Sequence, residues 1–171
     1  MAEYINNKNF YNLILEYKEK CKSADEDDLP VPKIPDKIGE CFIMIATKLA
    51  TKGNFVGYTY TDEMICDALE NCVIAIHSFN PEKSKNPFAY FTQIIWYAFL
   101  RRIEKEKKQT YVKYKSLEHL MIELNMSEED KDTYSNFDIE NEKMIPIIEK
   151  FEKSKAKKLK KKIGLERYIK E

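Results

Sequence analysis

The sequence predicts an all-α protein, built as a small bundle of helices. Only four glycines occur among 171 residues, which is few for a β-sheet protein whose strands are joined by tight turns. Apolar residues recur at helical spacing in several segments, and no segment shows a clear strand pattern. Hydrophobic residues make up 43% of the chain, enough to build a buried core. Helices joined by short loops are therefore the expected architecture.

Residues 1–36 are expected to form an N-terminal helix followed by a linker. In "NNKNFYNLILEYKEKCKS", capping asparagines precede an apolar stripe at helical spacing. The stripe consists of Phe10, Leu13, Ile14 and Tyr17. The following "ADEDDLPVPKIPDK" combines an acidic run with three prolines, which predicts a semi-extended linker.

Residues 37–116 are expected to form the helical core. The segment "KIGECFIMIATKLATKG" predicts a helix that ends at Gly53 as its C-terminal cap. Its inward stripe is Ile38, Phe42, Ile45 and Leu49. The segment "DEMICDALENCVIAIHSF" predicts a second helix, capped by Thr61 and acidic in its first turn. The stripe of this second helix is Ile65, Leu69, Cys72, Ile76 and Phe79.

A third core helix is expected after "NPEKSKNP", with Asn86 as its cap and Pro87 as its first residue. Its inward stripe is Phe88, Phe91, Ile95, Ala98, Phe99 and Ile103. The opposite face carries rings, an amide and then positive charge. These outward residues are Tyr90, Gln93, Tyr97 and Arg101, with Trp96 at the edge and Arg102 and Lys105 beyond.

This outer face suits single-stranded nucleic acid. A base stacked on a ring gains roughly 1–3 kcal/mol, a glutamine reads base edges, and arginine and lysine hold phosphates. The same rings are also consistent with packing beneath another part of the chain. The exposure of this face decides between the two interpretations.

Residues 117–171 form a third zone of different composition. Acidic residues dominate 118–142, lysines dominate 143–162, and an apolar tail carries Leu165, Tyr168 and Ile169. The lysine-rich segment is open to three interpretations: contact with DNA, contact with an acidic partner, or folding back on the acidic segment.

Several function classes find no support in the sequence. Positive and negative charges balance to zero, although a zero sum does not exclude a nucleic-acid partner. The four cysteines form no Cys-x-x-Cys pair and the two histidines stand apart, so we expect no metal, no cofactor, and reduced core thiols at Cys41 and Cys72. No enzyme motif, membrane span or secretory signal is recognisable, so a non-enzymatic intracellular protein is expected.

The second and third core helices resemble the second conserved region of bacterial sigma factors, which binds RNA polymerase and opens the −10 element. "FAYFTQIIWYAF" lies at the aromatic motif of that region. The runs "NFVGYT", "EMI", "KSKNPFAYFTQ" and "RIEKE" are more closely similar to late-transcription sigma factors of T-even-like bacteriophages. The resemblance covers residues 37–116. It implies a helical module that acts in the cytoplasm of an infected bacterium.

The aromatic motif aligns in two registers. One register places Phe91 at the sigma tyrosine. The other, shifted by one residue, places Tyr90 there and agrees with Tyr90 lying on the outer face. Both registers lose the tandem tryptophans of the family, which implies weaker unaided melting.

The resemblance implies binding and strand capture without covalent chemistry. Tyr90, together with Phe79, would hold a base flipped out of the −10 element. The implied DNA contacts are Phe79, Lys83, Lys85, Tyr90, Gln93, Trp96, Tyr97, Arg101, Arg102 and Lys105. The implied contacts to the coiled coil of the polymerase β′ clamp are Asp62, Glu63, Asp67 and Glu70.

Nothing after residue 116 resembles the domain that reads the −35 element. The family therefore implies help from a coactivator and from a DNA sliding clamp, with Leu165, Tyr168 and Ile169 as clamp contacts. The alternative is a polymerase-binding adaptor or anti-sigma protein that does not touch DNA. Burial of Tyr90, Gln93 and Tyr97 would favour that alternative.

Overall fold

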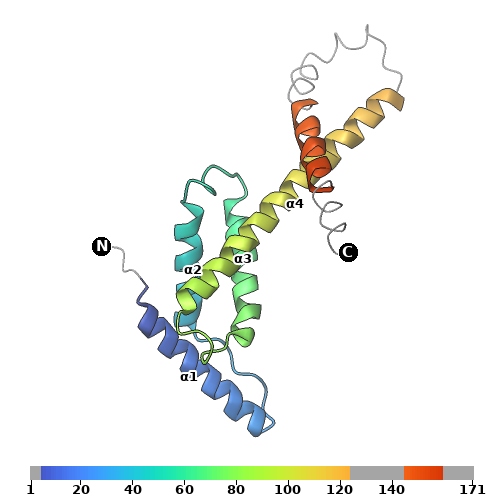
Figure 1. Cartoon of the computed structure of the whole chain (residues 1–171). Helices are drawn as coiled ribbons and strands as arrows, with labels where there is room; N and C mark the ends of the chain where they lie inside the picture. Colours follow the sequence, from blue (N-terminus) through green and yellow to red (C-terminus); the bar gives the residue numbers. More distant parts are fainter. Residues whose placement is uncertain (1–4, 124–144, 160–171) are drawn as a thin grey trace, which may run out of the picture. The chain divides into compact units, whose positions relative to one another are not determined.

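The described part of the chain, residues 5–123 and 145–159 of a computed structural model, is helical and contains no strand. This confirms the all-α prediction. The elements are α1 (Asn7–Glu26), α2 (Asp36–Ala50), α3 (Thr61–Ala75), the short η1 (Ile76–Ser78), α4 (Pro87–Glu123) and a helix over residues 145–159 (Figure 1). The chain divides into two compact units, Met1–Ile103 and Glu104–Glu171. Among the described helices, none is long and apolar enough to cross a membrane.

Aromatic rings from three helices meet at the centre of the first unit. The Phe91 ring of α4 lies 4.6 Å from Phe42 of α2 and 5.8 Å from Phe10 of α1, centroid to centroid. Such ring pairs contribute more than their buried area alone. Phe10, Ile14 and Tyr17 are all buried, so the N-terminal helix is part of this core and shares a compact unit with the helices that follow it.

The inward face of α4 is as the sequence predicts except at Phe88, which is half-buried. Phe91, Ile95, Ala98, Phe99 and Ile103 are each no more than 7% exposed. The start of the helix is also confirmed: it begins at Pro87. The side-chain oxygen of Asn86 accepts a hydrogen bond from the backbone N–H of Ala89 at 3.1 Å, which satisfies a donor that the first turn leaves unpaired.

The predicted ends of the two preceding helices are wrong by a few residues. The helix α2 ends at Ala50 with Thr51 as its cap, before Gly53. The chain then turns so that Phe55 enters the core, where it is fully buried, and this burial outweighs another helical turn. At the start of α3 the cap position is Tyr60. The hydroxyl of Thr61 instead donates to the carbonyl of Tyr58 at 2.6 Å.

The buried stripe of α3 also differs from the prediction. Met64, Ala68 and Cys72 are the fully buried residues of the helix. Ile65 and Leu69, expected at the centre of the stripe, only pack against its edge. The face of α3 that enters the core is therefore the one that carries Met64, Ala68 and Cys72.

Contacts from α1 hold the loop between η1 and α4. The side chain of Asn7 donates to the carbonyl of Lys85 at 3.3 Å and accepts from the backbone N–H of Phe88 at 3.2 Å. The Tyr11 hydroxyl donates to the carbonyl of Pro81 at 3.2 Å. These bonds fix the entry into α4. The N-terminal helix thus positions the loop that carries the predicted phosphate-binding lysines.

The linker after α1 is also tied to the helix. The Tyr17 hydroxyl donates to the carbonyl of Pro32 at 3.3 Å. Burial, reinforced by Cys21, raises the pKa of Tyr17 to about 12. Tyr17 is therefore protonated at any physiological pH and remains a hydrogen-bond donor.

The second unit pairs the later part of α4 with the helix over residues 145–159 (Figure 1). The Tyr111 and Phe151 rings stack with centroids 4.5 Å apart. The Tyr111 hydroxyl also donates to the Glu152 carboxylate at 3.2 Å. Lys158 forms an ion pair with Glu104. The hydrogen bond within this pair lowers the pKa of the Glu104 carboxyl. These pairs require the two helices to run antiparallel.

Candidate nucleic-acid interface

The outer face of α4 carries an exposed row of polar and aromatic side chains. We call Tyr90, Gln93, Tyr97 and Arg101 the α4 ridge. Their spacing of three or four residues places them on one side of the helix. Gln93 and Arg101 are exposed, and Tyr97 is 52% exposed. The ring of Tyr97 therefore offers a surface to solvent rather than packing under another segment of the first unit.

Tyr90 is a half-buried member of the ridge that rests on core rings. Its centroid lies 5.1 Å from Phe79 and 5.1 Å from Phe91, both in edge geometry. These contacts fix the plane of the Tyr90 ring before any ligand binds. The hydroxyl end of a half-buried ring of this kind is the part that reaches toward water.

The Phe79 ring has no exposed face on which a base could stack in this conformation. Its side chain is only 2% exposed. In this conformation Phe79 is a core residue, and its expected contact with a flipped base stays a prediction. The apolar stripe of the sequence correctly predicted Phe79 as a core residue. From this position the Phe79 ring supports the Tyr90 ring.

The two arginines near the ridge differ in their surroundings. The Arg102 guanidinium lies 3.2 Å from the Asp67 carboxylate, with the Arg102 side chain only 16% exposed. Arg102 is thus engaged within the protein, and its expected role as a phosphate contact stays a prediction. Arg101 donates to the side-chain oxygen of Asn71 at 2.7 Å but remains exposed. Arg101 therefore keeps donors available to a phosphate.

The same two bonds fix how α3 and α4 run past one another. Asp67 and Asn71 of α3 meet Arg102 and Arg101 of α4 in antiparallel order. Further along, Ile74 follows Asn71 by three residues on α3, and Tyr97 precedes Arg101 by four residues on α4.

Ile74 is 65% exposed and Leu100, one turn from Tyr97, is 43% exposed. The sequence interpretation missed both residues as parts of this surface. Their helical spacing from Asn71 and Tyr97 was the available signal. An exposed apolar side chain one turn from an exposed ring, as Leu100 is from Tyr97, is typical of a contact surface.

Trp96 lies at the edge of this surface and is anchored by the loop after α2. Its ring meets the buried Phe55 edge-on, with centroids 4.7 Å apart. The tryptophan is half-buried. It is therefore only partly accessible and cannot act as a fully free stacking wedge.

The loop before α4 places two exposed lysines, Lys83 and Lys85, next to the first turn of the helix. The side-chain oxygen of Asn80 accepts backbone hydrogen bonds from Glu82 at 2.8 Å and Lys83 at 3.4 Å, which shapes the turn. Lys105, also expected to contact DNA, is exposed and belongs to the second unit.

The acidic residues of α3 fall into two groups. Asp62, Glu63 and Glu70 are exposed, whereas Asp67 is engaged by Arg102. The first two lie in the first turn, where carboxylates are favoured by the helix dipole. The predicted clamp contacts Leu165, Tyr168 and Ile169 lie outside the described residues.

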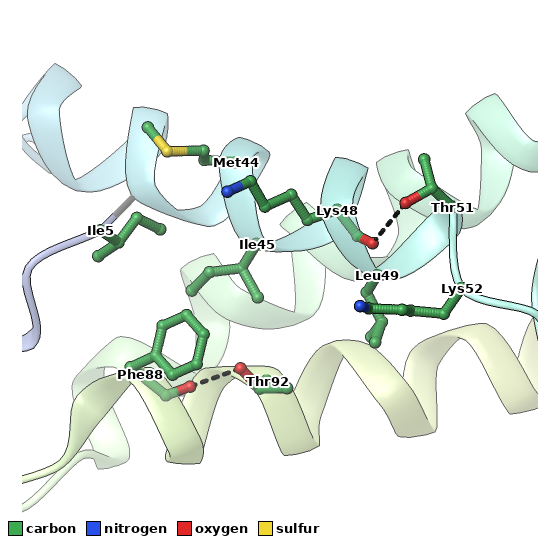
Figure 2. A pocket seen from close by; sticks show the side chains of 9 residues that line it. All are labelled: Ile5, Met44, Ile45, Lys48, Leu49, Thr51, Lys52, Phe88 and Thr92. Carbon is green, nitrogen blue, oxygen red and sulfur yellow. Dashed lines mark hydrogen bonds between the residues drawn. The ribbon is translucent and has the colours of Figure 1, made fainter. Parts of the chain in front are cut away.

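A separate cavity of about 400 Å³ lies between α2 and the start of α4 (Figure 2). Its walls are mainly apolar, with two lysines and two threonines at the margin. The lining residues are Ile5, Met44, Ile45, Lys48, Leu49, Thr51, Lys52, Phe88 and Thr92. Both threonine hydroxyls donate to carbonyls of their own helices, Thr51 to Lys48 and Thr92 to Phe88. Among the described residues that line this cavity, Lys48 and Lys52 are the only ionisable ones.

The cysteines and acidic residues do not form a metal site in the part of the chain that the structure describes. All four cysteines are free thiols. Cys72 is fully buried and Cys41 half-buried. Burial raises the pKa of the Cys72 thiol to about 12, which is the behaviour of an unreactive core thiol.

The chain was compared with protein-family models and with curated protein sequences. No protein-family model matches the chain, and no curated protein sequence matches it.

Proposed function

We propose that this protein is a sigma factor of the phage late-transcription type. It binds the host core RNA polymerase in the cytoplasm of an infected bacterium and captures the unpaired non-template strand of an A·T-rich −10 element. The observation that carries the proposal is the exposed α4 ridge, in which Tyr97 is 52% exposed between exposed Gln93 and Arg101. The sequence resemblance to sigma factors supports the same assignment.

The ridge has the chemistry that an unpaired strand requires. A tyrosine ring stacks on any base, an amide bonds to a base edge, and an arginine holds the phosphate between two nucleotides. Tyr90 contributes a ring whose orientation is already fixed by Phe79 and Phe91. A preorganised ring loses little conformational entropy when a base stacks on it.

Stacking offsets the cost of opening the duplex. Extruding a base costs a few kcal/mol, and least where the pairs are A·T, while each stacked base returns roughly 1–3 kcal/mol. Two accessible rings therefore balance the opening of about one or two base pairs. The remaining free energy would come from polymerase, which explains why the factor would act only as part of the complex.

Polymerase binding is assigned to the exposed carboxylates of α3. Asp62, Glu63 and Glu70 are exposed and would meet basic residues of the β′ clamp coiled coil. Rim charges of this kind speed association and fix orientation more than they add affinity.

Promoter strength would depend on further phage proteins, as the resemblance to late-transcription sigma factors implies. A coactivator and a sliding clamp are the expected partners. The apolar tail residues Leu165, Tyr168 and Ile169 would hold the clamp, and a tethered contact raises the local concentration of its partner.

Run-off transcription tests the proposal. The purified chain and bacterial core polymerase should together start RNA at a discrete site on a supercoiled template with an A·T-rich −10 box, whereas core alone should not. A chain that binds core polymerase by gel filtration but starts no RNA on any such template, with or without a phage coactivator, would refute the sigma assignment.

A polymerase-binding adaptor or anti-sigma protein is the second candidate. The observation that favours it is the ion pair between Arg102 and Asp67, in which the Arg102 side chain is only 16% exposed. Such a protein would inhibit transcription by the host sigma factor without protecting promoter DNA. Adding the chain to a host holoenzyme reaction, and measuring both RNA and the DNA footprint, separates the two candidates.

A further inference from the structure

We infer that the helix over residues 145–159 binds the phosphate backbone of duplex DNA through Lys150, Lys153 and Lys157. We call these three residues, with Ser154 beside them, the lysine stripe. Duplex binding of this kind needs no polymerase and no unpaired strand. It is therefore separate from the capture proposed for the α4 ridge.

The stripe lies on the side of the helix that turns away from its partner helix. Ile148, 6% exposed, and Phe151, stacked on Tyr111, mark the packed side. At 100° per residue, the three lysines cluster within about 60° on the opposite side. Pro146, Glu149, Lys150, Lys153, Ser154 and Lys157 together line one shallow groove. The lysine side chains are all exposed.

Ion pairing within the second unit leaves this side positive. Glu104 pairs with Lys158, and Glu152 lies 3.8 Å from Lys115. Both pairs involve the packed side of the helix. On the stripe itself, Glu149 pairs with Lys153 at 2.7 Å, and the bond lowers the pKa of the carboxyl. Lys150 and Lys157 therefore carry the uncompensated charge of the stripe.

The dimensions fit a nucleic-acid backbone. Seven residues of helix separate Lys150 from Lys157, a rise of roughly 10 Å. Duplex DNA carries one charge per about 1.7 Å of its axis, so several phosphates lie within reach of the flexible side chains. Lysine and serine are also common among phosphate-contacting residues.

An acidic protein is the less suitable partner. Protein interfaces depend on a few buried aromatic or arginine anchors at the centre of the contact. The groove along the stripe is lined by three lysines, a glutamate, a serine and a proline, with no aromatic residue or arginine among these lining residues. A contact of this composition stays wet and is dominated by charge, as in non-specific DNA binding.

The test measures binding of the full chain to a labelled duplex of random sequence by fluorescence anisotropy at several salt concentrations. A plot of the logarithm of the association constant against the logarithm of the salt concentration has a negative slope. The stripe variant Lys150→Gln, Lys153→Gln, Lys157→Gln should reduce the magnitude of this slope by about two to three. The matched control is Lys20→Gln, Lys22→Gln, Lys33→Gln, which removes the same charge from three exposed lysines of the first unit. The slope of the control variant should differ from that of the wild type by less than about 0.5.

Two outcomes would overturn the inference. If the stripe variant and the control change the slope equally, the chain responds to net charge and not to this face. If the stripe variant weakens binding to labelled poly-glutamate but leaves duplex binding unchanged, the stripe serves an acidic protein. Circular dichroism of both variants should match the wild type, because the substituted side chains are exposed and glutamine is a good helix former.

Discussion

At the scale of single residues, Tyr97 is the side chain on which the proposed strand capture would depend most. It is the most exposed ring of the α4 ridge, and its neighbours Gln93 and Arg101 are exposed as well. Tyr90 shares the ridge but also supports the core through Phe79 and Phe91. Substituting Tyr90 by alanine would therefore disturb both folding and promoter opening. A substitution at Tyr97 tests promoter opening alone.

We expect Tyr97→Ala to reduce open-complex formation by roughly 5- to 150-fold, the loss of one stacked base at about 1–3 kcal/mol. Tyr97→Phe keeps the ring and should open promoters nearly as well as the wild type. Permanganate reactivity of the −10 thymines measures both. Ile43→Ala, at a residue of α2 that is 50% exposed, is the control. Equal opening by Tyr97→Ala and the wild type would remove Tyr97 from the mechanism.

Cys72 and Cys66 should differ sharply in reactivity. Cys72 is fully buried, and burial raises the pKa of its thiol to about 12, so almost no thiolate exists at pH 8. Cys66 is exposed. Iodoacetamide labelling followed by peptide mass spectrometry should modify Cys66 in the native protein and Cys72 only after urea is added. Labelling of both at one rate in the native state would contradict the burial of α3 against the core.

At the scale of elements, α4 has two sides with different tasks. The inward side packs Phe91 against Phe10, Phe42 and Phe79, and the outward side carries the ridge. Stability and the proposed function should therefore respond to different substitutions on the same helix.

Phe91→Ala should lower the free energy of unfolding by about 3–5 kcal/mol, because it leaves a cavity among rings that cannot close on it. Tyr97→Ala should change it by less than about 0.5 kcal/mol, as expected for an exposed position. Urea unfolding followed by circular dichroism gives both values. A large loss of stability in Tyr97→Ala would mean that the ridge is structural.

The sequence predicted α4 well because its pattern is strong: an asparagine cap, a proline at the first position, and an apolar stripe with a helical period. It predicted the ends of α2 and α3 less well. Those ends depend on Phe55 entering the core from a loop, which is a tertiary event that helical propensity does not contain.

The candidate site was predicted in part. The exposure of Gln93 and Tyr97 agrees with a single-helix pattern, because both faces of one helix can be read from spacing alone. The ion pair between Arg102 and Asp67 joins residues 35 positions apart, and spacing within one helix cannot reveal it. Phe79 was assigned both a core position and a DNA contact, and its burial settles only the first.

At the scale of the whole molecule, the chain is two compact units with different surfaces. The net charge of zero hides this difference, because exposed acidic residues of α3 belong to the first unit and the lysine stripe belongs to the second. A protein organised in this way can offer one surface to polymerase and others to DNA. The transcription and duplex-binding experiments test these surfaces separately.

The most direct test of the central claim is site-specific crosslinking from the ridge. Tyr97→benzoylphenylalanine, incorporated into the full chain and assembled with core polymerase on a template that carries a preformed bubble, places a photoreactive ring where we propose that a base stacks. Irradiation should join the chain to the non-template strand within the −10 element. Crosslinks from position 97 to polymerase subunits alone, in complexes that still start RNA, would contradict the account.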